Sequence, residues 1–171
     1  VSYAAFNVAK AAFDPARDRD VLGTPRLYFN QASPSAYLRG NTRAVPLALA
    51  YLRSLAHRGA RVLNGAEVFA LELSKSAQIA LLRTLGVDHP RSITFNDVDA
   101  AAGLSDSLPW PALLKPDQGG SGARIQVVDS IDAVRDIFAK NRSIWEPDHL
   151  FLLQELLPHD EQHGIVRLEF L

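Results

Sequence analysis

The spacing of apolar residues in the first third of the chain predicts a small parallel α/β unit. Residues 26–30 and 61–64 are short apolar runs typical of strands, and residues 45–58 have helical spacing. Pro46 falls in the first turn of that helix and Gly59 follows its last residue, as helix boundaries favour. Because a strand, a helix and a strand follow one another directly, we expect the two strands to pair in parallel.

A second helix is predicted to start just after Ser74, a favourable N-cap, and to end at Gly86. Its apolar face consists of Ile79, Leu81, Leu82 and Leu85. Lys75 falls in the first turn, where an exposed cation opposes the helix dipole at a cost of about 0.3–1 kcal/mol. A lysine placed against its local preference points to a functional role.

The rest of the chain is predicted to alternate strands with one longer helix. A short strand covers residues 91–95, Asn96 is a candidate cap for a brief helix, and the Pro/Gly/Ser-rich stretch 103–109 indicates a subdomain boundary. After it come a helix from Ser130 to about residue 140 and strands at 111–115, 123–128, 150–154 and 165–171. From residue 111 the predicted order is strand, glycine-rich loop, strand, helix, strand.

Composition and charge exclude several classes of function. The chain has 18 basic and 19 acidic residues, and this balance offers no basic footprint for nucleic acid. It has no cysteine, so thiolate nucleophiles, thiolate metal sites and disulfides are excluded. No apolar stretch approaches the roughly 20 residues of a membrane span. We therefore expect a soluble protein with neither a membrane nor a nucleic-acid partner. The absence of cysteine leaves the redox compartment open, and the location we expect is the cytoplasm.

The loop 117–122, Asp-Gln-Gly-Gly-Ser-Gly, is the sharpest local signal in the sequence. Gly119, Gly120 and Gly122 have no Cβ and can take positive φ, so their backbone N–H groups can surround phosphate oxygens. The loop joins two predicted strands, whereas the Walker and dinucleotide motifs have other spacings and lead into a helix. Taken alone, the loop fits a phosphate-binding loop and an ordinary flexible hairpin about equally well.

Three further features around this loop make the phosphate-binding interpretation the stronger one. Lys75 lies in a helix, Lys115 ends a strand and is followed by Pro116, and Gln154-Glu-Leu-Leu157 follows a later strand. In this order they resemble the ATP-grasp family, from about Arg61 to the end of the chain. The group that the sequence resembles most is the glutamate-ligase-like, or carboxylate–amine ligase, group.

The resemblance implies roles for individual residues. The two lysines and the glycine loop would contact the nucleotide phosphates, and the hinge at 154–157 would contact adenine chiefly through its backbone. Glu161 stands where the family often has an acid that binds the ribose hydroxyls, with Asp160 as a rival. Arg167 matches the family's arginine on the last strand and is the catalytic candidate, although Ile165 replaces an aspartate common there. The expected cofactor-binding residues are Lys75, Lys115, Gln118, Gly119, Gly120, Ser121, Gly122, Gln154, Glu155, Leu156, Leu157 and Glu161.

The resemblance also implies the fold class and the domain organisation. The expected fold is α/β: a partial, parallel pre-ATP-grasp region at 1–64, followed by the N-terminal half of an ATP-grasp domain at 65–171. A lid subdomain would occupy about 109–157. The metal-binding half of the family's domain would lie beyond Leu171, so this chain would bind ATP weakly and make no product.

The implied reaction is ATP-dependent ligation, in which a carboxylate is activated as an acylphosphate and attacked by an amine. The cofactors would be ATP and Mg²⁺, and the partners small-molecule or peptide carboxylate and amine substrates; a homo-oligomer is compatible with the sequence. His159 and His163 have a zinc-binding spacing, but Pro158 and Gly164 oppose a helix there, so no metal ligand is predicted within the chain. The alternative function is a non-catalytic module that binds nucleotide or a partner.

Overall fold

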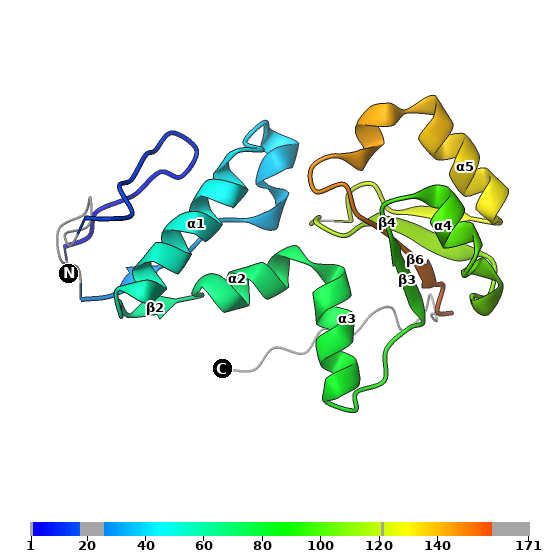
Figure 1. Cartoon of the computed structure of the whole chain (residues 1–171), viewed down its shortest axis with the longest axis horizontal. Helices are drawn as coiled ribbons and strands as arrows, with labels where there is room; N and C mark the ends of the chain where they lie inside the picture. The colour runs from blue at the N-terminus through cyan, green and yellow to red at the C-terminus, as the bar shows by residue number, and fades with distance from the viewer. Residues whose placement is uncertain (1, 18–25, 121, 159–171) are drawn as a thin grey trace.

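The computed structural model describes residues 2–17, 26–120 and 122–158 of the 171-residue chain. They form two packed bodies connected by a pair of helices, as Figure 1 shows. The first body contains β1 (Tyr28–Phe29), the 3₁₀ segment η1 (Pro34–Arg39), α1 (Ala44–His57) and β2 (Val62–Leu63). The connecting helices are α2 (Ala66–Leu73) and α3 (Lys75–Thr84).

The predicted parallel unit is confirmed in the first body. β1 and β2 pair in parallel, with Tyr28 opposite Val62. The core lies under α1, which buries Val45, Ala48, Leu52 and Leu55 at the three- and four-residue spacing of one helix face. Phe69 of α2 is fully buried in the same cluster. The first core therefore extends past residue 64, and the domain limits given above remain predictions.

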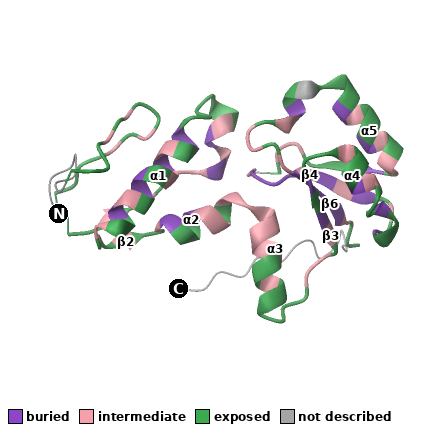
Figure 2. Ribbon diagram, viewed as in Figure 1, coloured by how far each residue is buried: buried purple, intermediate pink, exposed green. Residues whose placement is uncertain are grey.

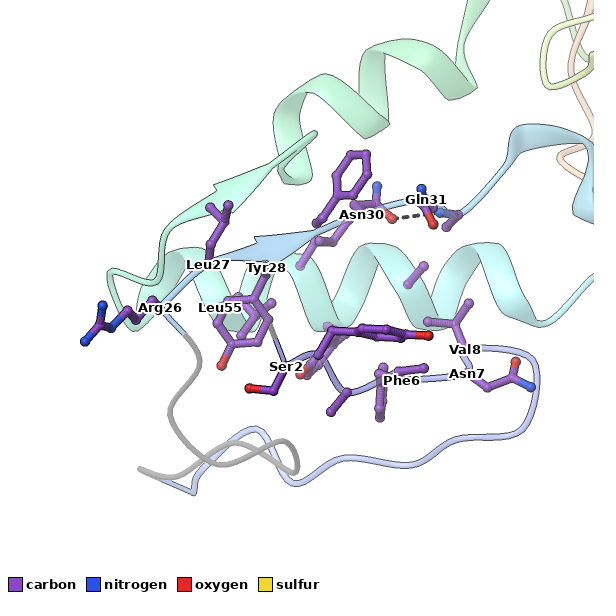
Figure 3. Close-up of a pocket in the computed structure, with 18 residues that line it drawn as sticks. Ser2, Phe6, Asn7, Val8, Arg26, Leu27, Tyr28, Asn30, Gln31 and Leu55 are labelled. Atoms are coloured by element: carbon purple, nitrogen blue, oxygen red, sulfur yellow. Dashed lines mark hydrogen bonds between the residues drawn. The ribbon is translucent and has the colours of Figure 1, made fainter.

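The first body also has a pocket of about 1300 Å³ that is open to one side. Its walls are residues 2–8, β1 and the segment after it, and one side of α1, as Figure 3 shows. The Phe6 ring packs on Tyr51 of α1, with ring centroids 4.3 Å apart. The N-terminal segment thus lies along α1 and covers part of its apolar surface.

The apolar face predicted for α3 is not buried among the described residues. Ser74 caps the helix as expected, because its Oγ accepts from the N–H of Ala77 at 3.1 Å. No residue of α3 is buried, and Figure 2 shows the contrast with α1. Leu81 and Leu85 are 41% and 65% exposed. What this helix contributes to the described structure is therefore its N-terminus.

The second body is a four-stranded antiparallel sheet in the order β3-β6-β4-β5. The strands are β3 (Ser92–Phe95), β4 (Ala112–Pro116), β5 (Gln126–Val128) and β6 (Phe151–Glu155). The helical segments are α4 (Val98–Ala102), η2 (Ser105–Ser107), α5 (Ile131–Lys140) and η3 (Arg142–Trp145). One face of the sheet, with Leu114, Phe151 and Leu153, packs on Val134 and Phe138 of α5.

Two predicted boundaries are wrong by a few residues. β5 begins at Gln126 rather than at residue 123, because Gly122 and Arg124 take positive φ (67° and 64°) and turn the chain first. The cap of α4 is Asp97 rather than Asn96, since its Oδ1 accepts from the N–H of Ala100 at 2.9 Å. The strand predicted at 165–171 lies outside the described residues.

Within residues 2–17, 26–120 and 122–158, none of the helices combines the length and the apolar character that a membrane span requires.

Candidate functional site

The side chains of β4 alternate between the packed core and the opposite face of the sheet. Ala112, Leu114 and Pro116 are buried, while Leu113 and Lys115 are only partly buried. The period of two residues therefore places Lys115 on the face away from α5. The strand ends directly before the glycine loop, so Lys115 stands at its base.

Lys75 reaches the same place from the start of α3. Its Nζ donates to the backbone carbonyl oxygens of Pro116 at 2.7 Å and Asp117 at 2.8 Å. Burial lowers the pKa of Lys75, and the nearby charges of Asp117 and Asp148 partly offset that shift. The helix N-terminus and the end of β4, separated by 41 residues in sequence, are joined by one ammonium group.

Lys115 is half-buried beside this first cation. Its Nζ donates to Oε1 of Gln154, a neutral acceptor on β6. Burial lowers the pKa of Lys115, and the positive charge of Lys75 lowers it further. Within the described ranges, neither lysine forms a salt bridge with a carboxylate. Two converging ammonium groups bound only to neutral oxygens suit a multiply charged anion such as a polyphosphate.

The first two residues of the glycine loop are fixed by hydrogen bonds. Asp117 is 2% exposed, and its Oδ1 accepts from the N–H of Ser76 at 2.7 Å. The backbone N–H of Gln118 donates to Oδ2 of Asp148 at 2.8 Å, and its side-chain Nε2 donates to the carbonyl oxygen of Pro34 at 3.3 Å. Burial raises the pKa of Asp148. Backbone N–H groups that donate to its carboxylate, that of Gln118 first among them, oppose this shift. The base of the loop is therefore anchored to α3, to η1 and to the segment before β6.

The three glycines of the loop do not share one conformation. Of the three, Gly122 alone takes positive φ. At Gly120 a Cβ would lie 3.1 Å from Cβ of Ser35, and at Gly119 it would lie 3.2 Å from Nζ of Lys75. Positive φ therefore applies at one of the three, and the other two are glycines at points of close approach.

The hinge residues occupy the end of β6. The N–H of Glu155 donates to the carbonyl oxygen of Arg91 at 2.9 Å, and the N–H of Arg91 donates to Oε2 of Glu155 at 3.1 Å. Leu156 and Leu157 follow the strand and are 36% and 52% exposed. The structure thus brings Lys75, Lys115, Gln118, Gly119 and Gln154 into one region, and their role in binding nucleotide stays a prediction.

Not every predicted site residue lies within the described part of the chain, and two residues that support the site were not predicted from the sequence. Ser121, Glu161 and Arg167 lie outside the described residues. Asp148 and Ser92, which hold Gln118 and Gln154, were not predicted, because neither stands in a local motif and both act through contacts distant in sequence. Among the described residues, no group of three or more His, Cys, Asp or Glu side chains could hold a metal ion.

Several known proteins resemble this chain in sequence or in structure. No protein-family profile matches the chain. The carbamoyl phosphate synthase large chain of Rubrobacter xylanophilus is 30% identical over 113 residues, which are 66% of this chain and 10% of that protein. A RimK domain ATP-grasp protein from Sphaerobacter thermophilus superposes with a TM-score of 0.63 at 20% identity, over 88% of this chain and 52% of that one.

Two other solved structures are similar over a smaller part of the chain. The biotin carboxylase domain of 2-oxoglutarate carboxylase from Hydrogenobacter thermophilus, in complex with MgADP and bicarbonate, has a TM-score of 0.54 at 19% identity, over 64% of this chain and 25% of its own. The VanG D-Ala:D-Ser ligase from Enterococcus faecalis has a TM-score of 0.52 at 22% identity, over 65% and 33%.

The chain corresponds to only part of the length of each of these proteins. The chain spans about half of the RimK domain protein, at 52%, and a tenth of the carbamoyl phosphate synthase chain. At identities of 19–22%, the superpositions establish shared architecture rather than shared substrates. The chain has the ATP-grasp fold that the sequence resemblance implied, with Lys75 at the start of α3, Lys115 on the antiparallel sheet and the glycine loop after β4.

Proposed function

We propose that Lys75, Lys115 and the glycine loop bind the phosphate groups of ATP, as part of an ATP-dependent carboxylate–amine ligase. The observation that carries this proposal is that two half-buried ammonium groups lie beside the start of the loop and donate to neutral oxygens, Lys75 to the carbonyl groups of Pro116 and Asp117 and Lys115 to Gln154. Burial disfavours the charged form of both lysines and lowers their pKa values, and the charge of Lys75 adds to the lowering of the pKa of Lys115. A bound polyphosphate would offset that cost.

In the proposed reaction, a carboxylate oxygen attacks the γ-phosphorus of ATP, and the bond from that phosphorus to the β,γ-bridging oxygen breaks. The products are an acylphosphate and ADP. A neutral amine then attacks the acyl carbon, the carbon–oxygen bond to phosphate breaks, and the amide loses a proton as inorganic phosphate leaves. Such phosphoryl transfer depends chiefly on positioning and on charge neutralisation, so the protein needs no nucleophile of its own.

The chain's residues would contribute positioning and charge. Lys75 and Lys115 would neutralise phosphate oxygens, and the N–H groups of the glycine loop would donate to them. The backbone of 154–157 would contact adenine, Glu161 the ribose, and Arg167 the reacting groups. Magnesium would arrive with the nucleotide, because among the described residues no group of three or more His, Cys, Asp or Glu side chains could hold it. The carboxylate and amine would belong to a small molecule or a peptide.

The complex of the Hydrogenobacter domain supports the nucleotide part of the proposal, because a protein of the same fold holds MgADP and bicarbonate. A non-catalytic, nucleotide-binding module is the second candidate. The two differ in what they produce: a ligase forms ADP when a carboxylate is supplied and an amide when an amine is added as well, whereas a binding module forms neither.

Isothermal titration of the 171-residue chain with MgATP tests the binding step. Lys115→Met removes the charge but keeps most of the apolar stem. Losing one charge-assisted contact should weaken ATP binding by about 1.5–3 kcal/mol, roughly tenfold or more. Lys140→Met is the matched control, because that lysine is exposed on α5. Equal ATP affinity in Lys115→Met and the parent chain would remove Lys115 from the site, and no binding by the parent would refute the proposal.

A further inference from the structure

The 3₁₀ segment η1 of the first body lies against the glycine loop of the second. A Cβ on Gly120 would lie 3.1 Å from Cβ of Ser35, and the side chain of Gln118 donates to a backbone carbonyl oxygen of η1 at 3.3 Å. Just after the loop, the guanidinium carbon of Arg124 lies 6.0 Å from the ring centroid of Tyr37. One wall of the candidate site therefore comes from the first body, and Tyr37 is part of it.

The hydroxyl oxygen of Tyr37 is enclosed, yet it has no hydrogen-bond partner in the described part of the chain. The same part holds one other enclosed side-chain oxygen without a partner, Oγ of Ser54 on α1. An enclosed hydroxyl has lost its bonds to water, so leaving it without a partner opposes folding. A bound ligand that completes the hydrogen bonding is one physical reason for keeping such a group.

The Tyr37 hydroxyl and the Lys75 ammonium lie on the same side of Gly119. A Cβ on this glycine would be 3.8 Å from the phenol oxygen and 3.2 Å from Nζ of Lys75. An ammonium has three N–H donors, and two of those on Lys75 are taken by the carbonyl oxygens of Pro116 and Asp117. The third has no acceptor among the described residues. Two unused donors, one of them charged, therefore border the space beside a residue that has no side chain.

An acceptor that suits both donors is an anionic oxygen, which binds ammonium and hydroxyl groups at about 2.5–2.9 Å. The two carboxylates whose charges act on Lys75 are bound to backbone N–H groups instead. Asp117 accepts from the N–H of Ser76, and Asp148 accepts from that of Gln118. Within its described ranges the chain supplies no anion to these two donors, so the acceptor must come from a ligand.

We infer that the Tyr37 hydroxyl binds a phosphate oxygen of the nucleotide, beside Gly119 and next to the ammonium of Lys75. The inference rests on the proposed function, and it adds a residue of the first body to a site whose predicted residues all follow residue 74. The hydroxyl is enclosed in the free chain, so the loop must shift for a phosphate to enter. No hydrogen bond from the N–H groups of Gly119 and Gly120 to a described residue has to break for that shift.

A structural role for the hydroxyl predicts a different result. A hydroxyl that stabilised the fold would have a partner, and its removal would lower the melting temperature. Removing a hydroxyl without a partner should leave the melting temperature unchanged or raise it, because the cost of enclosing the group disappears. Tyr37→Phe keeps the ring beside Arg124 and removes the oxygen alone, so this variant isolates the hydroxyl.

The experiment measures binding of MgATP, inorganic tripolyphosphate and adenosine to the 171-residue chain and its variants, by NMR titration. Tyr37→Phe should weaken binding of MgATP and of tripolyphosphate about three- to thirtyfold, as expected for the loss of one hydrogen bond to a charged acceptor. Ser54→Ala is the matched control, because it also removes an enclosed hydroxyl without a described partner but lies in α1. It should leave the affinity for all three ligands unchanged.

Adenosine affinity should stay unchanged in Tyr37→Phe, because the loop and the hinge lie at opposite ends of β4. The register places Phe151 opposite Pro116, where the loop begins, and Glu155 opposite Ala112. Four residues of an extended strand separate these two ends by roughly 13 Å. A ligand that contacts the hinge alone therefore does not reach the hydroxyl.

The outcomes separate this inference from the proposed function. If the parent chain binds MgATP and Tyr37→Phe binds it equally well, the hydroxyl does not contact a phosphate. Equal losses of affinity for MgATP and adenosine would also overturn the inference, and so would a lower melting temperature with unchanged MgATP affinity, because both indicate a structural role. If the parent chain binds no MgATP, the proposed function is wrong and the inference falls with it.

Discussion

The Nζ of Lys75 lies 2.7 Å from the backbone carbonyl oxygen of Pro116, so the first residue of α3 is bonded to the last residue of β4. A lysine in a first turn opposes the helix dipole. Here the side chain leaves the helix and binds carbonyl oxygens, while the carboxylate of Asp117 accepts from the N–H of Ser76. The helix N-terminus thus receives a negative charge, and the lysine serves the loop.

Lys75→Met should destabilise the folded chain, because it leaves the partly buried carbonyl oxygens of Pro116 and Asp117 without their donor. We expect the free energy of unfolding to fall by about 1–3 kcal/mol, as for the loss of a donor that is charged. Urea titration followed by circular dichroism measures it. Lys140→Met, at an exposed position, should change it by less than about 0.5 kcal/mol. Equal stabilities in the two variants would show that water satisfies these carbonyl groups.

The sequence predicted the two lysines, the loop and the order of strands because each has a local signal. Ser74 and Ser130 are residues that favour helix N-caps. Lys115 ends a clear apolar run, and the glycines that follow indicate a loop. It did not predict Asp148, because the contact with Gln118 joins residues 30 positions apart and no periodic pattern encodes it. Contacts of this kind depend on tertiary packing.

The glycine loop shows the same limit on a smaller scale. That the loop is glycine-rich was plain, but the reason for each glycine was not. Positive φ applies at Gly122, whereas at Gly120 the constraint is the nearby Ser35, 85 positions earlier in the printed sequence. A local rule finds the first kind of glycine and is blind to the second.

ATP affinity should fall as the pH rises through the lowered pKa of Lys115, which burial and the charge of Lys75 both depress. Anion binding needs the protonated lysine, so affinity is lost earlier than an ordinary lysine pKa of about 10.4 would allow. Stability has the opposite sign. Between the lowered pKa and about 10.4, the unfolded chain binds more protons, so the contribution of Lys115 to stability rises with pH.

Lys115→Arg separates these effects, because a guanidinium stays charged over this range. Calorimetric titrations with MgATP from about pH 7 to about pH 10 should show a smaller loss of affinity in this variant than in the parent chain. Lys75 titrates in both proteins and provides a shared background. Identical pH profiles would mean that the Lys115 proton does not control binding.

Gly120→Ala should destabilise the chain by contact rather than by backbone strain. The φ of Gly120 lies outside the left-handed region, but a new Cβ would stand 3.1 Å from Cβ of Ser35. Overpacking of this kind costs about 1 kcal/mol or more. Ser35→Gly removes the opposing Cβ, so a double-mutant cycle by urea titration should give a favourable coupling of about 0.5–1 kcal/mol. Strictly additive effects would show that the loop and η1 are independent.

The glycine loop should be protected from hydrogen exchange at its base and open at its tip until nucleotide binds. The N–H of Asp117 donates to the carbonyl oxygen of Leu150 at 3.0 Å, and that of Gln118 donates to Asp148 at 2.8 Å. The N–H groups of Gly119, Gly120 and Gly122 donate no hydrogen bond to another described residue. Loops that close over phosphates come from the least stable part of a fold.

Amides at residues 119, 120 and 122 should therefore exchange quickly in the free chain and slow when MgATP is added, while those at 117 and 118 are protected in both states. Exchange followed by NMR resolves these positions one by one. The helix α1 is the internal control, because its buried face belongs to the first body and should not respond to nucleotide. In a chain that binds MgATP by calorimetry, unchanged exchange at all three glycines would mean that the phosphates lie away from this loop.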